Sequence, residues 1–275
     1  MKRLNKKDKA VLDNLDRLLA GEPLKEPHSY LEDKILQVLK SFEYTKEKRE
    51  NEQKSISRLI SDISHQIKTP LSALSLHLEL AKDDSLSLEE RIPELNECSK
   101  QTQKIQFLTE AVLKVARLET GLISVKRIDA DVVLTIQSAV STIRPRLIEK
   151  NLSLELIIPS SLVISHDPIW TKEAITNLLD NAIKYTKTGG ITISLEKGAI
   201  YTRIDISDTG IGISPDDYTK IFERFYRSRS KDADFVEGTG LGLPIAREIL
   251  RLQGGNITVL STNKGSTFSV FLQNC

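Results

Sequence analysis

The spacing of apolar residues in this 275-residue chain changes character after Gly121. Before that point, apolar residues recur every three or four positions, which is the period of one helix face. From Leu122 onward, short strand-like segments alternate with helical ones, which favours a layered α/β domain. A chain of this length is typical of about two domains, and residues 122–275 are numerous enough to enclose their own core.

The N-terminal part is predicted to be helical. Residues 4–20 have the pattern of a short amphipathic helix that Gly21 closes. A long helix is expected to begin near Ser29, with heptad spacing that passes through a polar middle. The heptad positions are Leu31, Ile35, Val38, Phe42, Thr45, Arg49, Glu52, Ile56, Leu59 and Ile63. This pattern predicts a coiled coil, although an ordinary long surface helix also shows some spacing of this kind.

The apolar spacing after Ile63 predicts a helical bundle. The stripe takes two steps of four in succession, through Ile63, Ile67, Leu71, Leu74 and Leu78. Such a stutter locally relaxes supercoiling and suits a four-helix bundle better than a two-stranded rod.

A second helix is expected after a break at residues 83–87. Ser87 and Glu90 form a capping box, while Pro93 leaves the start of the helix open. The helix ends at Gly121 and carries its own apolar stripe, at Ile92, Leu95, Ile105, Leu108, Val112 and Val115. Two antiparallel helices cannot bury both stripes alone, so a homodimer that forms a four-helix bundle is predicted.

The C-terminal part alternates between strands and helices. Strands are predicted at 122–128, 152–158, 162–165, 190–196, 199–207, 256–261 and 266–272. Helices are predicted at 130–149, 168–185 and 241–253. Residues 213–240 have weak periodicity and many charges, which indicates a mobile loop.

The composition excludes several classes of protein. The net charge is +1, so there is no electrostatic argument for binding nucleic acid. The basic first residues favour a solvated end of the chain, with contact to a membrane surface as the alternative. The two cysteines lie far apart and form neither a disulfide framework nor a zinc pattern. Without an apolar run long enough to span a bilayer or a signal peptide, the chain as given is expected to be cytoplasmic.

The octapeptide SHQIKTPL, residues 64–71, is a candidate site for phosphorylation. His65 lies two residues from both Ile63 and Ile67, so it faces water if these isoleucines face the core. A neutral imidazole can act as a nucleophile, and Lys68 could steady a phosphoryl oxygen. Thr69 follows one turn later on the same side of the helix as His65. The other histidines, His28, His77 and His166, are expected to be surface residues without a role.

Three later blocks have the features of a nucleotide site. The first lies on the predicted helix that Asp167 and Pro168 begin. Asn177, Asn181 and Lys184 share one face of this helix. Two amides and an ammonium suit Mg²⁺ and a triphosphate, because Mg²⁺ takes few protein ligands and relies on substrate phosphates.

The other two blocks are rich in glycine. Asp208, Gly210 and Gly212 form a D-x-G-x-G turn after a predicted strand. Its glycines allow close backbone approach to a base, and the carboxylate can accept from an adenine amino group. The glycines of the last block, Gly238, Gly240 and Gly242, lead into a helix whose first amides can hold phosphate.

The chain resembles the sensor histidine kinases of two-component systems over about residues 55–275. SHQIKTPL is similar to the H box of that family, TNLLDNAIKY to the N box, DTGIG to the G1 box, IFERFYR to the F box, GTGLGL to the G2 box and Gly265–Phe268 to the last glycine block. The resemblance implies an all-α dimerisation and phosphotransfer hairpin at 55–121, then an α/β sandwich of the Bergerat ATP-binding type at 122–275. Residues 1–54 resemble a helical linker that carries a signal from an upstream sensor segment or a partner protein.

The resemblance also implies a reaction. ATP with Mg²⁺ would phosphorylate His65, and the phosphoryl group would pass to an aspartate of a response regulator. By position, Asn181 matches the magnesium ligand, with Asn177 and Lys184 near the phosphates. Tyr185 would border the base, and Arg227 would reach the γ-phosphate. Thr69 matches the residue that positions water for dephosphorylation of the regulator, and full-length relatives are usually anchored in the cell membrane.

One residue departs from the family pattern. Many relatives have Glu or Asp after the histidine as general base, whereas Gln66 cannot take a proton at neutral pH. Asp62 is a candidate substitute. An alternative hypothesis is that Gln66 orients the imidazole through a hydrogen bond while water takes the proton.

Two other functions are compatible with parts of this sequence. One is a non-kinase ATPase with the same ATP-binding fold, against which stand the H box and the lack of an acidic, water-activating residue near Asn177. The other is a catalytically weak dimeric scaffold, which Gln66 motivates and the complete N and glycine boxes oppose.

Overall fold

The computed structural model describes Asp13, Asn14, Arg17 and residues 30–83, 85–119, 124–228, 238–262 and 264–274. The three isolated residues are helical and belong to the predicted helix 4–20, whose other residues lie outside the described ones. Gly21, His28 and the predicted helix end at Gly121 lie outside them as well, as does part of the predicted loop 213–240. The chain divides into two compact units, Met1–Gln66 and Ile67–Cys275.

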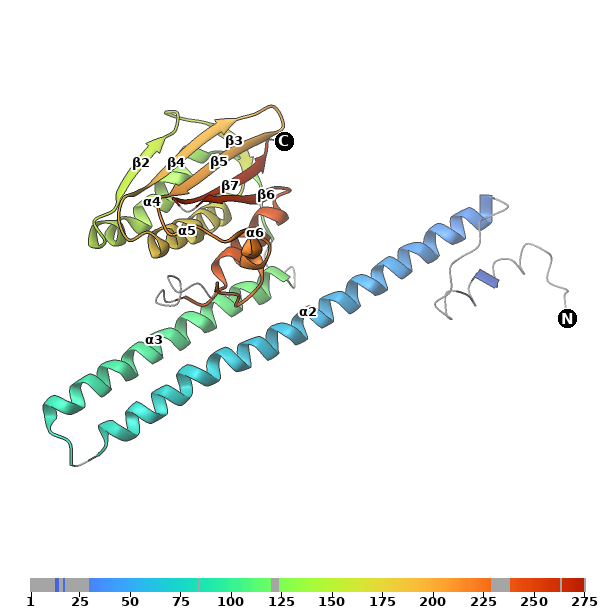
Figure 1. The fold of residues 1–275 in the computed structure, drawn as a ribbon. Helices are drawn as coiled ribbons and strands as arrows, with labels where there is room; N and C mark the ends of the chain where they lie inside the picture. The colour runs from blue at the N-terminus through green and yellow to red at the C-terminus, as the bar shows by residue number, and fades with distance from the viewer. Residues whose placement is uncertain are drawn as a thin grey trace, which may run out of the picture. The chain divides into compact units, whose positions relative to one another are not determined.

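Two long helices account for most of the N-terminal part of the chain (Figure 1). Helix α2 spans Tyr30–Ala81 and helix α3 spans Leu88–Glu119. Helix α2 continues through Pro70, although a proline inside a helix removes one backbone hydrogen bond. Among the described residues, no helix has an apolar stretch long enough to cross a bilayer.

The predicted capping box begins α3. The backbone N–H of Ser87 donates to Glu90 Oε2 at 2.9 Å, and the N–H of Glu90 lies 3.4 Å from Ser87 Oγ. Each side chain therefore satisfies a backbone donor of the other, which leaves the helix start without orphan groups at these two positions. Pro93 is accommodated inside α3 and is exposed.

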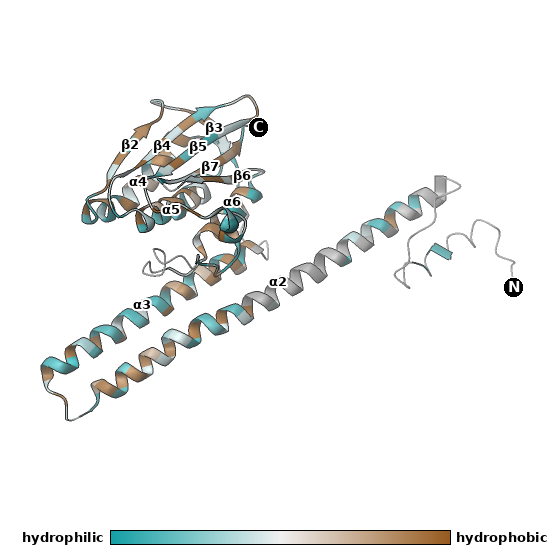
Figure 2. Ribbon diagram, viewed as in Figure 1, coloured by the Kyte–Doolittle hydropathy of each residue, from teal (hydrophilic) through white to brown (hydrophobic). Residues whose placement is uncertain are grey.

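The hairpin exposes many apolar side chains near its turn. Figure 2 shows apolar residues in brown on both helices. The exposed side chains near the turn are Leu71, Leu76, Leu78, Leu80, Leu88, Ile92 and Leu95, each at least 41% exposed. Further along α3, by contrast, Leu108 and Val115 of the predicted stripe are buried. The predicted stripe of α3 is thus open at one end of the helix and covered at the other.

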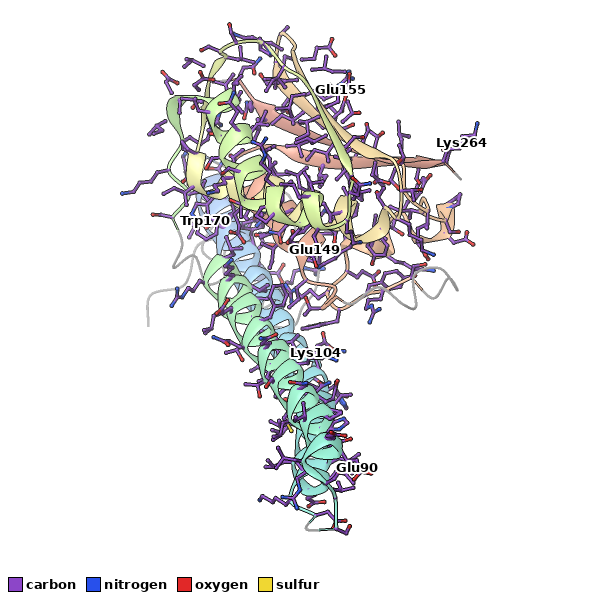
Figure 3. The ribbon with its side chains drawn as sticks, turned by 90° about the vertical axis from the view of Figure 1, so that its left-hand side faces the viewer. Glu90, Lys104, Glu149, Glu155, Trp170 and Lys264 are labelled. Carbon is purple, nitrogen blue, oxygen red and sulfur yellow. The ribbon has the colours of Figure 1, made fainter. Side chains whose placement is uncertain are left out.

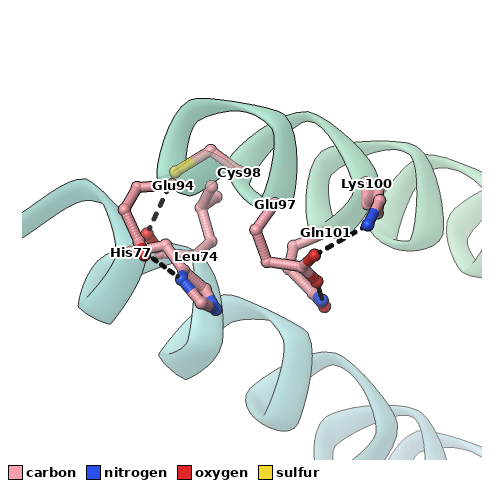
Figure 4. Close-up of polar contacts among 7 residues, drawn as sticks. All are labelled: Leu74, His77, Glu94, Glu97, Cys98, Lys100 and Gln101. Carbon is pink, nitrogen blue, oxygen red and sulfur yellow. Dashed lines mark hydrogen bonds and ion pairs between the residues drawn. The ribbon is translucent and has the colours of Figure 1, made fainter. Parts of the chain in front are cut away.

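Polar contacts join the two helices near the turn (Figure 4). His77 Nδ1 on α2 lies 2.6 Å from Glu94 Oε2 on α3, and the Cys98 thiol donates to the Leu74 carbonyl at 3.8 Å. The prediction that His77 is an unengaged surface histidine was therefore wrong. The same expectation failed for His166, which is completely buried and has both ring nitrogens within hydrogen-bond distance of a partner.

The remaining residues form an α/β sandwich. Its helices are α4 (Val132–Glu149), α5 (Pro168–Tyr185) and α6 (Gly242–Leu252), with short 3₁₀ helices η1 (Pro215–Asp217) and η2 (Lys220–Phe222). Its strands are β1 (Ile128–Asp131), β2 (Ser153–Ile157), β3 (Val163–His166), β4 (Gly190–Lys197), β5 (Tyr201–Asp208), β6 (Asn256–Thr262) and β7 (Gly265–Gln273). The predicted helices and six of the seven predicted strands match these bounds within two residues.

The exception is the predicted strand 122–128, which was wrong for residues 124–127, while residues 122 and 123 lie outside the described ones. Residues 124–127 belong to no strand, and β1 begins only at Ile128, where it pairs antiparallel with β3. The reason is the shortness of β3, which ends at His166 because Asp167 caps the next helix. The segment before Ile128 therefore finds side-chain partners in place of a strand.

The main sheet has the order β2-β4-β5-β7-β6 among the described residues, with β2 parallel to β4 and the other pairs antiparallel. Alternate residues of its central strands are buried, including Ile193, Ile204, Ile206 and Val270. Helices α4, α5 and α6 lie on the same side of this sheet (Figure 1). Figure 3 adds the side chains, with Glu155 on β2 and Trp170 near the start of α5. Burial of the alternating residues under the helices forms the core.

Candidate functional site

Helix α5 positions the first group of candidate residues. Asp167 Oδ1 accepts hydrogen bonds from the N–H groups of Ile169 and Trp170 at 3.0 and 3.1 Å, which confirms the predicted N-cap. The helix buries Ala174, Ile175, Leu178, Leu179, Ala182 and Ile183 in the core. Asn177, Asn181 and Lys184 are consequently half-buried on another side of the same helix.

The described residues enclose a cavity of about 580 Å³, a volume usual for a site that binds a small molecule. Ten of the eleven residues predicted to bind nucleotide line it: Asn177, Asn181, Lys184, Tyr185, Asp208, Gly212, Arg227, Gly238, Gly240 and Gly242. They come from α5, from the end of β5 and from the segments around η2 and α6. The fold thus brings together three blocks that are far apart in the sequence.

Gly210 is the predicted residue that is absent from the cavity wall. Its N–H donates to Asp208 Oδ1 at 2.8 Å. A Cβ at this position would stand 2.5 Å from the carbonyl oxygen of Tyr185. Gly210 therefore allows the loop after β5 to pass close to the end of α5.

Two other glycines are required by their backbone conformation. Gly212 and Gly240 have positive φ angles of 73° and 69°. A Cβ on Gly212 would stand 2.0 Å from the Thr262 carbonyl oxygen, and one on Gly240 would stand 2.7 Å from the Phe225 backbone. Larger residues would strain both turns and displace the cavity wall.

Asp208 presents a buried carboxylate to the cavity. Its Oδ1 accepts from the N–H groups of Gly210 and Ser266 at 2.8 and 3.3 Å. Burial raises the pKa of this carboxyl above its usual value of 3.8, and these two hydrogen bonds act in the opposite direction. When ionised, the Asp208 carboxylate can accept a hydrogen bond from a ligand amino group that enters the cavity.

The two residues that end α5 are also desolvated. Burial lowers the pKa of Lys184 from 10.5; the nearby Asp180 acts in the opposite direction, and Arg146 and Arg227 act in the same direction as burial. Burial raises the pKa of Tyr185 from 10.0. Cationic side chains gathered at a partly buried wall favour an anionic ligand such as a polyphosphate.

The amides of α5 are suited to hold a metal with a phosphate. Asn177 Nδ2 donates to the Glu173 carbonyl at 3.0 Å, so its Oδ1 is turned elsewhere. A Cβ on Gly242 would lie 3.3 Å from that Oδ1, which places the oxygen next to the start of α6. Amide oxygens beside a glycine-rich helix start fit a Mg²⁺ ion that shares ligands with phosphates.

Several residues of the cavity wall were not anticipated. Helix α3 contributes Phe107, Glu110, Ala111 and Lys114. Two acidic residues near Asn177, Glu173 and Asp180, also line the cavity. Both carboxylates are engaged, however: Glu173 pairs with Lys114 at 2.7 Å, and Asp180 pairs with Arg146.

Ser261 does not line the cavity but supports its wall, and it has no sequence signal of its own. Its hydroxyl oxygen accepts from the N–H of Ile213 at 2.7 Å and lies 2.9 Å from Ser266 Oγ. Its carbonyl accepts from the Tyr218 hydroxyl at 2.8 Å. Ser261 therefore ties the loop after Gly212 to the start of β7, where Ser266 approaches Asp208.

The candidate phosphorylation site lies on α2. His65 is exposed while Ile63 and Ile67 are half-buried, as predicted from their spacing. Gln66, Lys68 and Thr69 are exposed as well. An exposed imidazole in this setting is available to an incoming reactant.

Two family models match the chain. Residues 55–121 match the His Kinase A (phospho-acceptor) domain. Residues 166–274 match the histidine kinase-, DNA gyrase B- and HSP90-like ATPase domain. Together they cover the octapeptide with His65 and all the blocks that line the cavity.

Curated relatives are sensor proteins. Drug sensory protein A of Synechocystis sp. is 32% identical over 249 residues, covering 84% of this chain and 36% of the relative. Sensor protein kinase PmrB of Pseudomonas aeruginosa is 32% identical over 219 residues, covering 78% of this chain and 45% of the relative. The chain therefore spans less than half the length of these two relatives.

Solved structures share the fold. Histidine kinase ThkA, solved in complex with response regulator protein TrrA, matches with a TM-score of 0.71 and 19% identity over 86% of this chain and 66% of ThkA. The histidine kinase AdeS of Acinetobacter baumannii matches with a TM-score of 0.64 and 22% identity, over 76% of this chain and 98% of AdeS. With a helical hairpin before an α/β sandwich, and a family match on each part, the chain belongs to the sensor histidine kinases.

Proposed function

We propose that the chain is an ATP-dependent protein-histidine kinase that phosphorylates His65 and passes the phosphoryl group to an aspartate of a response regulator. The observation that carries the proposal is the cavity that collects nine residues from three distant blocks, together with Arg227. The proposed domains are a helical linker at 1–54, a dimerisation and phosphotransfer domain at 55–121 and an ATP-binding domain at 122–275.

In the proposed binding mode, each wall of the cavity recognises one part of ATP. Asp208 accepts from the adenine amino group, and Tyr185 borders the base. Asn181, with Asn177 as a second candidate, holds Mg²⁺ through its amide oxygen while Lys184 and Arg227 contact phosphates. Bound Mg²⁺ would neutralise phosphate charge during transfer. The backbone around Gly238, Gly240 and Gly242 cradles the remaining phosphate oxygens.

The proposed reaction forms one bond and breaks another. A ring nitrogen of His65 uses its lone pair to attack the γ-phosphorus, and the bond to the bridging oxygen breaks so that ADP leaves. The imidazole proton passes to water, while Gln66 orients the ring and Lys68 steadies a phosphoryl oxygen. Phosphoryl transfer depends on positioning and charge neutralisation more than on covalent help, which this set of residues supplies.

The proposed kinase function implies three partners: a second copy of the chain, a response regulator and an upstream sensor. The apolar residues exposed near the hairpin turn need a cover, and a second copy of the hairpin supplies one in a homodimer. ThkA is solved with a response regulator, which supports a receiver domain as the phosphoryl acceptor. Thr69 is proposed to position water when the kinase dephosphorylates its regulator. An upstream sensor segment or partner protein would supply the signal through residues 1–54, and full-length relatives suggest anchoring in the membrane.

The test uses γ-labelled ATP and Mg²⁺ with the full chain. Acid-labile, base-stable label is expected on His65 in the wild type and is expected to be absent from His65→Ala. His77→Ala serves as a matched control, because His77 is a hairpin histidine that is half-buried beside Glu94. A wild type without label, or label that persists in His65→Ala, would rule the proposal out. Chase of the label onto a receiver domain then tests the second step.

A further inference from the structure

The short segment between the hairpin and the sandwich is fastened by side chains. The N–H of Lys126 donates to Asp167 Oδ2 at 2.8 Å. Arg127 Nη2 donates to the carbonyls of Ser165 and Gln273 at 3.2 and 2.7 Å. Lys126 and Arg127, which belong to no strand, thus have defined partners in the sandwich.

Asp167 uses its two carboxylate oxygens for different purposes. Oδ2 holds the segment at Lys126, whereas Oδ1 caps α5 through Ile169 and Trp170. The residue is only 6% exposed, so solvent competes little for these bonds. One carboxylate therefore joins the connecting segment to the first turn of the helix that carries Asn177 and Asn181.

A second cavity helix meets the same point. Gln253, which follows the last turn of α6, accepts through Oε1 from the N–H of Asp167 at 2.8 Å and from Thr171 Oγ1 at 3.2 Å. The start of α5 and the end of α6 are therefore linked to the connecting segment. Asn177 lies ten residues beyond Asp167, about 15 Å along a helix, so Asp167 is remote from the cavity residues themselves.

We propose that Asp167 is a positioning residue for the phosphoryl transfer: its carboxylate holds the connecting segment rigidly to the nucleotide-binding helix, so that bound ATP is presented to the hairpin in a defined orientation. This inference rests on the proposed kinase function. Loss of the bond to Lys126 alone should leave nucleotide binding intact and slow transfer, because fewer encounters would have the required in-line geometry.

Asp167→Ser separates the two roles of the carboxylate. Serine is a good N-cap, but its single hydroxyl cannot also accept from Lys126. Asp131→Ser is a matched control, because Asp131 Oδ1 caps α4 through Val133 at 2.9 Å and also accepts from the N–H of Leu162 at 3.1 Å. Among the described residues, no α4 residue lines the cavity.

The experiment measures the affinity for a non-hydrolysable ATP analogue and the autophosphorylation rate at saturating ATP, both with the full chain. We expect Asp167→Ser to keep the affinity within about twofold and to slow the reaction about tenfold, equivalent to about 1.4 kcal/mol. Asp131→Ser should change neither quantity. A wild-type rate in Asp167→Ser, or an affinity loss that matches the rate loss, would overturn the inference.

A second variant covers the case in which Asp167→Ser does not fold. Lys126→Pro removes the donor N–H from the other side of the bond and leaves Asp167 to cap α5. It should slow the reaction by a similar factor, and a wild-type rate counts against the inference. If the wild type itself takes no label, the proposed kinase function fails; if it is labelled and both variants match it, only the role of Asp167 fails.

Discussion

Lys114 Nζ on α3 lies 2.7 Å from Glu173 Oε1 on α5, and both residues line the cavity. The pair joins the helical hairpin to the ATP-binding sandwich one turn before Asn177. Its side chains are 44% and 32% exposed, and ion pairs this open stabilise by only about 0.2–1 kcal/mol. Such a contact can favour one docked arrangement and still open when the sandwich moves.

Charge exchange tests this contact. Lys114→Glu places two carboxylates together and should weaken the contact between α3 and the sandwich. The double variant Lys114→Glu with Glu173→Lys should restore this contact. Spin labels at the exposed Lys104 and Glu149 would show a broader distribution of label–label distances in the single variant than in the wild type. The double variant should show a narrow distribution again. Added salt should reduce the difference between the single variant and the wild type. A distance distribution in the single variant as narrow as that of the wild type would contradict the prediction.

Gln66→Glu should raise the autophosphorylation rate, because a carboxylate beside His65 can take the imidazole proton. A fully effective general base accelerates a reaction by about 100-fold or more, so the rate is expected to increase by up to about 100-fold. The initial rate with labelled ATP is the measurement. Gln103→Glu adds the same charge at an exposed position on α3 and should have no effect. An equal or lower rate in Gln66→Glu argues against the orienting role of Gln66.

Asp208→Asn should weaken nucleotide binding about 10- to 100-fold, in line with the strength of a hydrogen bond to a charged group. Asp205→Asn is the control, since Asp205 lies on the same strand and pairs with Arg203 at 3.1 Å. Titration calorimetry gives both affinities. Equal losses in the two variants would remove Asp208 from the base-binding role.

The pH dependence of binding follows from the same carboxyl. Burial raises the pKa of Asp208, so its carboxylate becomes protonated at a higher pH than that of an ordinary aspartate. Wild-type affinity should therefore start to fall at a higher pH than the titration of an ordinary aspartate would give, as the acceptor is lost. Affinity that stays constant until the carboxyls of exposed aspartates titrate would contradict this expectation.

His166 should make stability pH-dependent. Burial lowers its pKa below 6.5, so the unfolded chain binds a proton that the folded chain excludes. Its contribution to stability is present above about pH 6.5 and is lost as the pH falls below that value, by at most about 1.4 kcal/mol per pH unit. His166→Gln should reduce the change of the unfolding midpoint with pH between pH 7 and 5. A slope equal to that of the wild type would refute the prediction, and His77→Gln controls for loss of a partly exposed histidine.

Ile92→Glu should convert the proposed homodimer to monomers. Ile92 is 50% exposed near the hairpin turn, and burial of one such side chain contributes about 1.5–3 kcal/mol. The proposed symmetric dimer would contain two copies of the substitution, so its dissociation constant should rise about 100-fold or more. Sedimentation equilibrium measures this change. Leu134→Glu, at a 62% exposed position on α4, should leave the dimer unchanged.

Local patterns predicted most elements, because helix and strand periods reflect which side chains one face can bury. The Asp167–Pro168 start of α5 and the Ser87–Glu90 box of α3 were readable because a cap depends on residues within one turn. The strand 122–128 was mispredicted because pairing depends on a distant partner, and β3 is too short to extend it. His166 was misplaced for a similar reason, since its burial and its contact with Thr135 come from packing.

Family membership, the three nucleotide blocks and the exposed position of His65 could be inferred from residue order alone, because each depends on short spacings along the chain. The convergence of those blocks on one cavity, the entry of Lys114 into its wall and the double use of the Asp167 carboxylate arise only in the folded chain. These contacts join residues from 41 to 59 positions apart, as in Lys126–Asp167 and Lys114–Glu173. Their geometry is set by how helices and strands pack, and no local spacing encodes that packing.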